Sequence, residues 1–137
     1  MSGAVERIEA KLAPFEDWFI DCSDEIGTVQ AMMQERLSDN PSKLYQQLTK
    51  AEAWHARLTK LLADANAHLD IAEFKNLGTI DRSLTVLDRE TRLKNMVVTE
   101  RRVRDIILGL VESIKNRMIL GMSIGKANAG ERTRMAA

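Results

Sequence analysis

Apolar residues return every three or four positions in the segment that follows Pro14, which is the spacing of one face of an α-helix. Pro14 suits an early helical position, because its ring holds φ near the helical value. The pattern predicts a first helix over about residues 14–38, and Trp18 widens its apolar stripe. The stripe consists of Phe15, Phe19, Cys22, Ile26, Val29 and Met33.

A clear break separates this helix from a second, longer one. Asp39 or Asn40 can cap a helix, Pro41 can open it, and Gly78 can close it, which predicts a helix over residues 41–77. Such a helix extends roughly 55 Å, so another elongated element must pack against it. Its apolar positions alternate spacings of four and three, as in a coiled-coil seam. They are Leu44, Leu48, Ala51, His55, Leu58, Leu62, Ala65, Leu69 and Ala72.

The pattern predicts a third helix over about residues 85–122, with Asp81 or Thr85 as candidate caps. Its apolar face is interrupted near Glu100. Residues 126–137 have no strong periodicity and few apolar groups, which predicts a mobile tail. We expect an all-α protein with one domain over residues 1–125, in which long helices form an elongated hairpin or coiled-coil-like bundle. The apolar face of the third helix contains Leu93, Met96, Val97, Val103, Ile107, Leu110, Val111, Ile114 and Met118.

Composition agrees with a soluble chain that can form a core, since 45% of the residues are hydrophobic and 29% are charged. The single cysteine, Cys22, cannot form an intramolecular disulfide, and the start of the chain lacks a signal-peptide pattern, so we expect a cytoplasmic protein. The most apolar stretch, residues 106–124, contains Glu112, Lys115 and Arg117. These charges favour a buried interface helix over a membrane span.

The charge of the chain is zero overall but strongly polarised along the sequence. Residues 1–40 hold 3 basic and 9 acidic residues (net −6), residues 41–81 hold 5 of each, and residues 82–137 hold 12 basic and 6 acidic residues (net +6). A basic segment attracts polyanions or acidic surfaces, and an acidic segment attracts a basic neighbour.

The sequence offers no recognisable catalytic, metal or cofactor site, and we expect no enzymatic activity. His55 and His68 are the only histidines, and they lie roughly 140° apart around one ideal helix, so they cannot share a metal there. Cys22 belongs to an apolar stripe that gives its thiol no activation. The glycines lack the companions of a phosphate-binding loop.

Basic residues form rows at helical spacing, which suits salt-sensitive contact with phosphates; a solvated coiled-coil flank is the alternative. Tyr45, Trp54 and Phe74 are candidate aromatic groups for stacking on bases. Arg89, Arg92 and Arg102 add further positive charge. The candidate DNA-binding residues are Lys43, Lys50, Arg57 and Lys60 in the second helix and Lys94, Arg101 and Arg104 in the third.

Two short strings, His55-Ala56-Arg57-Leu58 and Ile114-Lys115-Asn116-Arg117, resemble segments of the phage recombination mediator family of the UvsY type. The resemblance spans about residues 40–125. It implies single-stranded DNA and a recombinase with its single-strand-binding protein as partners, a DNA contact for Arg57, a ring-shaped homo-oligomer, and, for a phage protein, the host cytoplasm. His55 departs from the family, which has lysine there. The oligomer contact implied for the last helix comprises Ile107, Leu110, Val111, Ile114 and Met118.

A second interpretation remains open from the same charge pattern. A helical structural adaptor, such as a virion or scaffold component, would dock its acidic end on the basic end of a neighbour without any nucleic acid.

Overall fold

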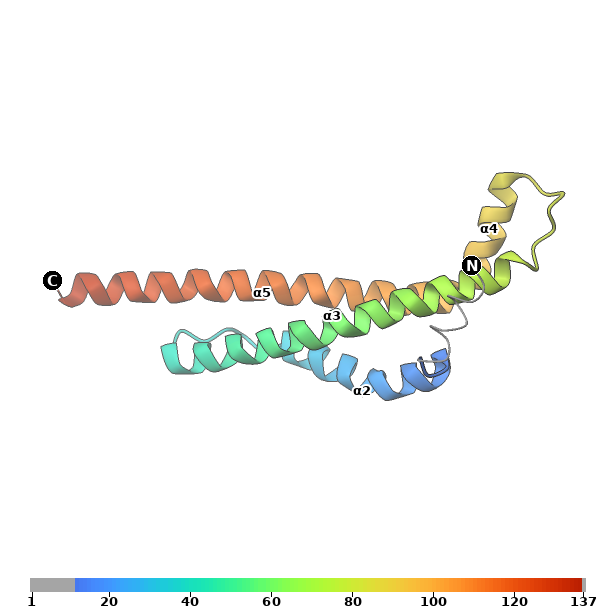
Figure 1. Ribbon diagram of the computed structural model, residues 1–137. Helices are drawn as coiled ribbons and strands as arrows, with labels where there is room; N and C mark the ends of the chain where they lie inside the picture. The colour runs from blue at the N-terminus through green and yellow to red at the C-terminus, as the bar shows by residue number, and fades with distance from the viewer. Residues whose placement is uncertain (1–11, 137) are drawn as a thin grey trace.

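The computed structural model describes residues 12–136, which form four helices and no strand: α2 (Phe15–Met33), α3 (Pro41–Leu77), α4 (Val86–Met96) and α5 (Val98–Ala136). The two long helices, α3 and α5, run antiparallel side by side, α2 packs along them, and α4 projects where α3 ends (Figure 1). The predicted all-α fold of long packed helices is confirmed. The elongated partner that α3 requires is α5.

The boundaries of α3 follow from the residues that the sequence marks. The side chain of Asn40 caps the helix, because its Oδ1 accepts hydrogen bonds from the backbone N–H groups of Ser42 at 3.0 Å and Lys43 at 3.2 Å. Pro41 occupies the first turn. The helix ends at Leu77, and Gly78 follows it with a right-handed φ of −68°.

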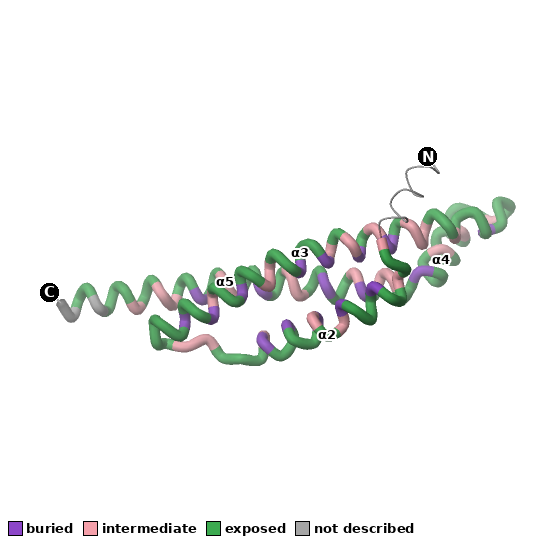
Figure 2. The backbone as a smooth tube through the Cα atoms, turned by 60° about the horizontal axis from the view of Figure 1, so that its bottom comes forward, coloured by how far each residue is buried: buried purple, intermediate pink, exposed green. Residues whose placement is uncertain are grey.

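Two adjacent rows of α3 are buried, whereas the sequence pattern predicts one seam. The first row faces α5: a Cβ atom added at Gly121 would collide with the side chain of Leu48, so α5 approaches α3 closely there. The second row faces α2, as the ring contacts of His68 with Phe15 and Trp18 show. Buried residues accordingly line the inner sides of all three helices (Figure 2). The second row consists of Gln47, Trp54, Leu61 and His68.

The shared core lies in the middle of the bundle, where α2, α3 and α5 meet. Leu58, Ile107 and Ile114 are completely excluded from solvent there. Full burial of one such side chain stabilises a fold by about 1.5–3 kcal/mol. The buried residues of the shared core are Trp18, Cys22, Ile26, Val29, Met32, Ala51, Leu58, Leu61, Ala65, Val103, Ile107 and Ile114.

The first helix ends at Met33, earlier than the predicted end near residue 38. The buried side chain of Gln47 explains the difference, because it satisfies the backbone of the connecting loop. Its Nε2 donates to the backbone oxygen of Arg36 at 2.9 Å, and its Oε1 accepts from the backbone N–H of Ser38 at 2.8 Å. These bonds replace helical ones and turn the chain toward α3.

The third predicted helix is divided into two. Val97 lies between α4 and α5 with φ −114° and ψ 24°, and its side chain is fully buried, so the chain bends where it docks on the bundle. Thr85 caps α4, as expected for one of the two candidate caps, by accepting from the backbone N–H of Asp88 at 3.2 Å.

The last helix continues to Ala136, across the segment 126–136 where the sequence predicts a mobile tail. No proline follows residue 98, so the helix can propagate once α3 has nucleated it. Asn128 also ties this segment to the loop before α3, because its Nδ2 donates to the backbone oxygen of Asp39 at 3.0 Å. Residues 1–11 and 137 lie outside the described residues.

Candidate nucleic-acid interface

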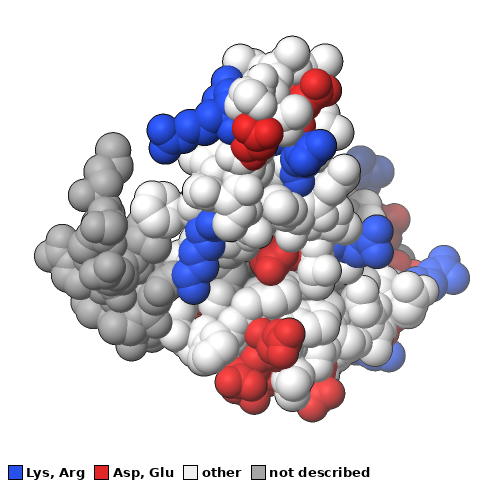
Figure 3. Space-filling view, turned by 90° about the vertical axis from the view of Figure 1, so that its right-hand side faces the viewer, with Lys and Arg blue, Asp and Glu red and all other residues white. Residues whose placement is uncertain are grey.

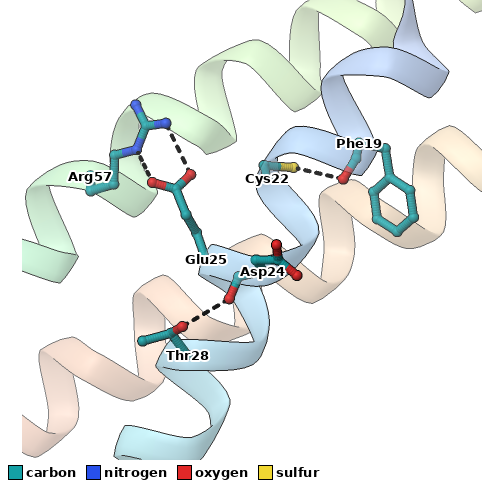
Figure 4. A network of polar contacts seen from close by, with 6 residues as sticks. All are labelled: Phe19, Cys22, Asp24, Glu25, Thr28 and Arg57. Carbon is teal, nitrogen blue, oxygen red and sulfur yellow. Dashed lines mark hydrogen bonds and ion pairs between the residues drawn. The ribbon is translucent and has the colours of Figure 1, made fainter.

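Arg57, the candidate that the family resemblance singles out, is held by an acidic residue of α2. Its Nε and Nη2 each donate a hydrogen bond of 2.9 Å to the two carboxylate oxygens of Glu25 (Figure 4). This contact raises the pKa of the Arg57 guanidinium. A phosphate would use the same two-pronged geometry, so Glu25 occupies the position that a phosphate would take.

The other candidates on α3 are exposed and lie along its outer surface. Lys43 and Lys50 precede Arg57 at intervals of seven residues, so the three share one edge of the helix, and Lys60 lies one turn beyond Arg57. Within residues 12–136, no carboxylate forms an ion pair with any of these three lysines. The cationic row therefore has one neutralised member, at its third position.

The bend at Val97 brings two candidates together across the junction of α4 and α5. The Nη2 of Arg101 donates a hydrogen bond of 3.2 Å to the backbone oxygen of Lys94. Arg102 follows on the exposed side and, with Arg101, lines a shallow hollow of about 400 Å³. We name Lys94, Arg101 and Arg102 the cationic flank. Arg104, the remaining candidate, instead donates from Nε to Asp105 at 2.7 Å.

Along the sequence, negative charge is concentrated toward the N-terminus and positive charge toward the C-terminus. In the folded molecule this gradient becomes a difference in charge across the width of the bundle. The first turn of α2 and the start of α5 lie at the same end, since Phe15, Glu16, Thr99 and Glu100 line one hollow. Viewed onto that end, Lys and Arg side chains lie in the upper part and at the flanks with some Asp and Glu among them, and a group of Asp and Glu lies in the lower part, over α2 (Figure 3). Residues 82–104 hold seven basic and three acidic residues, a net charge of +4.

The residues expected at an oligomer contact pack within the chain. Ile107 and Ile114 are fully buried in the shared core, and Leu110, Val111 and Met118 pack against it, partly buried. Their periodicity is the seam that α5 presents to α3 and α2, which the sequence alone cannot distinguish from a seam between chains. Among the described side chains, the large apolar ones that α5 leaves exposed are Val98, Ile106, Leu108, Ile119, Leu120 and Met122.

The three aromatic candidates differ in their surroundings. Trp54 packs against the shared core, whereas Tyr45 and Phe74 are exposed near opposite ends of α3. Phe74 lines a hollow of about 560 Å³ between the end of α3, the following loop and α4, together with Arg82 and Arg89. Arg82 is not among the candidates predicted from the sequence, because it lies in the loop between α3 and α4, where no helical spacing applies.

The more buried of the two histidines is not the one that the apolar seam predicts. His68, and not His55, is enclosed, with its ring centroid 4.9 Å from that of Trp18 and 5.6 Å from that of Phe15. Burial lowers the pKa of His68, and the charges of Asp64 and Glu100 oppose this shift in part. Burial likewise raises the pKa of the Cys22 thiol. Within residues 12–136, no three His, Cys, Asp or Glu side chains are arranged to hold a metal ion.

Comparison with known proteins does not assign this chain to a family. No protein-family model, no curated protein and no solved structure matches the chain. None of the helices within the described part of the chain has the length and apolar character that a membrane crossing requires.

Proposed function

We propose that this chain is a recombination mediator that assembles as an oligomer, binds single-stranded DNA through its cationic rows, and assists loading of a recombinase onto DNA covered by single-strand-binding protein. The observation that carries the proposal is the cationic flank, where Lys94, Arg101 and Arg102 gather on two helices at one bend. Arginine and lysine rows of this kind contact the phosphate backbone without reading sequence.

The chemistry of such a protein is mechanical, and no bond is made or broken by the chain. Each phosphate contact contributes modestly, so several chains bound along one strand act at a high effective concentration. The exposed apolar residues on both sides of α5, such as Ile106, Leu120 and Met122, support an assembly of chains. Release of condensed counterions makes the binding salt-sensitive.

The test is the anisotropy of a fluorescent oligo(dT) titrated with the protein across a salt series. We expect binding that weakens steeply with salt, and a smaller salt slope, by about 1 per lost contact, for Lys94→Ala and Arg102→Ala. Lys126→Ala, an exposed lysine on α5 away from the flank, is the matched control and should bind as the parent does. Salt-insensitive binding, or none at low salt, would contradict the proposal.

The adaptor function is the second candidate, favoured by the acidic surface over α2. The fold brings the acidic first turn of α2 beside the start of α5, so neighbours would dock side to side and not end to end. Mass measurement by light scattering separates the two candidates. Assembly that dissolves in high salt and ignores DNA would favour the adaptor, whereas assembly that persists in salt favours contact through apolar side chains.

A further inference from the structure

The corner between α3 and α4 is built from an ordered loop. The backbone N–H of Thr79 donates to the oxygen of Asn76 at 3.0 Å, which turns the chain directly after the helix. Ile80 is buried beneath the loop, and the carboxylate of Asp81 accepts from the backbone N–H of Ser83 at 2.9 Å. The hollow of about 560 Å³ at this corner therefore has defined walls.

These walls combine an apolar floor with a cationic rim. Phe74 and Leu77 are 47% and 58% exposed, although both are large apolar side chains at the end of a long helix. Arg82 enters from the loop and Arg89 from α4. No carboxylate lies among the lining residues, and no carboxylate pairs with either arginine within residues 12–136.

One buried donor in this hollow has no partner. The Nε of Arg89 is shielded from solvent and forms no hydrogen bond within the described range 12–136. Buried polar groups are usually hydrogen-bonded in folded proteins. Arg89 Nε is one of four buried side-chain atoms without a partner within residues 12–136, and among these it is the one on a residue that lines the corner hollow, where an acceptor would satisfy it. An anionic oxygen is the acceptor that a guanidinium binds most strongly.

We propose that the corner hollow is a nucleotide subsite for single-stranded DNA, in which a base stacks on Phe74 and the adjoining phosphate binds Arg82 and Arg89. A free anion would leave Phe74 and Leu77 in water, and an apolar segment would leave the guanidinium groups without a counter-charge. A nucleotide carries both an aromatic face and a phosphate, and its base can stack on any exposed aromatic ring. The volume suits a small ligand.

The subsite rests on the proposed DNA binding and extends it along one helix. Arg89 lies on α4, five residues before Lys94 of the cationic flank, and both belong to the segment 82–104, whose net charge is +4. A strand that follows the flank through its phosphates thus meets the corner as the place where a base is held.

The test compares oligo(dT) with an abasic oligonucleotide of the same length, which keeps the phosphates and lacks the bases. Phe74→Leu should weaken oligo(dT) binding about 5- to 100-fold and leave abasic binding unchanged, since one stacked base is lost. Arg89→Gln should weaken both and reduce the salt slope by about 1. Phe19→Leu, which makes the same change at a 37%-exposed ring on α2, is the matched control and should behave as the parent.

A second measurement separates lost stacking from a folding defect. In Phe74→Trp the new indole at the corner should be quenched by oligo(dT) and not by the abasic strand. If the parent binds oligo(dT) but Phe74→Leu and Phe19→Leu bind equally well, and the indole is not quenched, the subsite is excluded while DNA binding stands. If the parent binds no oligo(dT) at low salt, the proposed function fails and the subsite with it.

Discussion

Basic side chains have different partners in the middle of the bundle and at the α3–α4 corner. In the middle, three helices share one core, and Glu25 of α2 holds Arg57 in a two-pronged ion pair. At the corner, α4 buries none of its residues, and Arg82 and Arg89 have no carboxylate partner within residues 12–136. The third helix thus supplies the carboxylate that neutralises Arg57, whereas the corner, which no third helix covers, leaves its two arginines without one.

The prediction with the largest expected effect tests whether the shared core is packed more tightly than α4. Leu58→Ala removes a side chain that is 0% exposed, and we expect it to lower the free energy of unfolding by about 2–5 kcal/mol. Leu87→Ala on α4, where the side chain is 71% exposed, should change it by less than about 0.5 kcal/mol. Urea unfolding followed by circular dichroism measures both. A large loss from Leu87→Ala would mean that α4 is packed in solution.

The second prediction compares two glycines of α5, one inside the α3–α5 contact and one outside it. Gly109→Ala meets nothing within 4 Å and should stabilise the protein by about 0.5–1 kcal/mol through helix propensity. Gly121→Ala should be less stable than Gly109→Ala by about 1–2 kcal/mol, because the added Cβ displaces the side chain of Leu48. Equal thermal stability of the two variants would show that the helices are not in close contact at Gly121.

The third prediction concerns the ion pair between Glu25 and Arg57. Glu25→Gln should strengthen oligo(dT) binding about 3- to 10-fold at low salt, because it frees the Arg57 guanidinium for a phosphate. Asp24→Asn makes the same charge change one residue away, where the exposed carboxylate does not pair with Arg57, and should change binding less than about 2-fold. Equal effects of the two variants would mean that binding improves only because α2 carries less negative charge to repel DNA, and not because Arg57 is released.

Arg57→Ala completes this measurement. Its effect on binding should be larger in the Glu25→Gln background than in the parent, since only there is the guanidinium released. The same loss in both backgrounds would mean that the ion pair does not compete with DNA.

Periodicity predicts what is local and repeated, and fails where distant residues decide the outcome. Leu44, Ala51 and Leu58 are buried as expected, because the spacing of three and four defines a helical face. The break at Val97 has neither a glycine nor a proline to mark it, and depends on docking against the bundle.

The candidate site shows the same limit more strongly. Basic rows can be read from spacing, but the pairing of Arg57 with Glu25 joins residues 32 positions apart on two helices. The corner hollow depends on a loop conformation that no periodic pattern encodes. His68 is buried because α2 covers a second face of α3, and Gln47 because the loop after α2 packs on the same face. A single-seam interpretation cannot include either residue.

The smallest expected effect concerns His68, which lies where the cover by α2 begins. Burial against Trp18 and Phe15 lowers its pKa below 6.5, and the charges facing it from α3 and α5, Asp64 and Glu100, oppose this only in part. The unfolded chain therefore binds more protons than the folded one near pH 6, so stability is greatest above pH 6.5 and falls as the pH drops through that value.

Thermal unfolding at pH 7.5 and 5.5 measures this effect against His68→Phe, which keeps an aromatic ring at the position and removes the titration. The parent should lose more stability than the variant between the two pH values, because protonation places a charge between two aromatic rings and pushes α2 from α3. Carboxylates that titrate in the same range act equally in both proteins and cancel in the difference. An identical loss would show that His68 is solvated, and that α2 covers α3 less closely at this end than in the middle of the bundle.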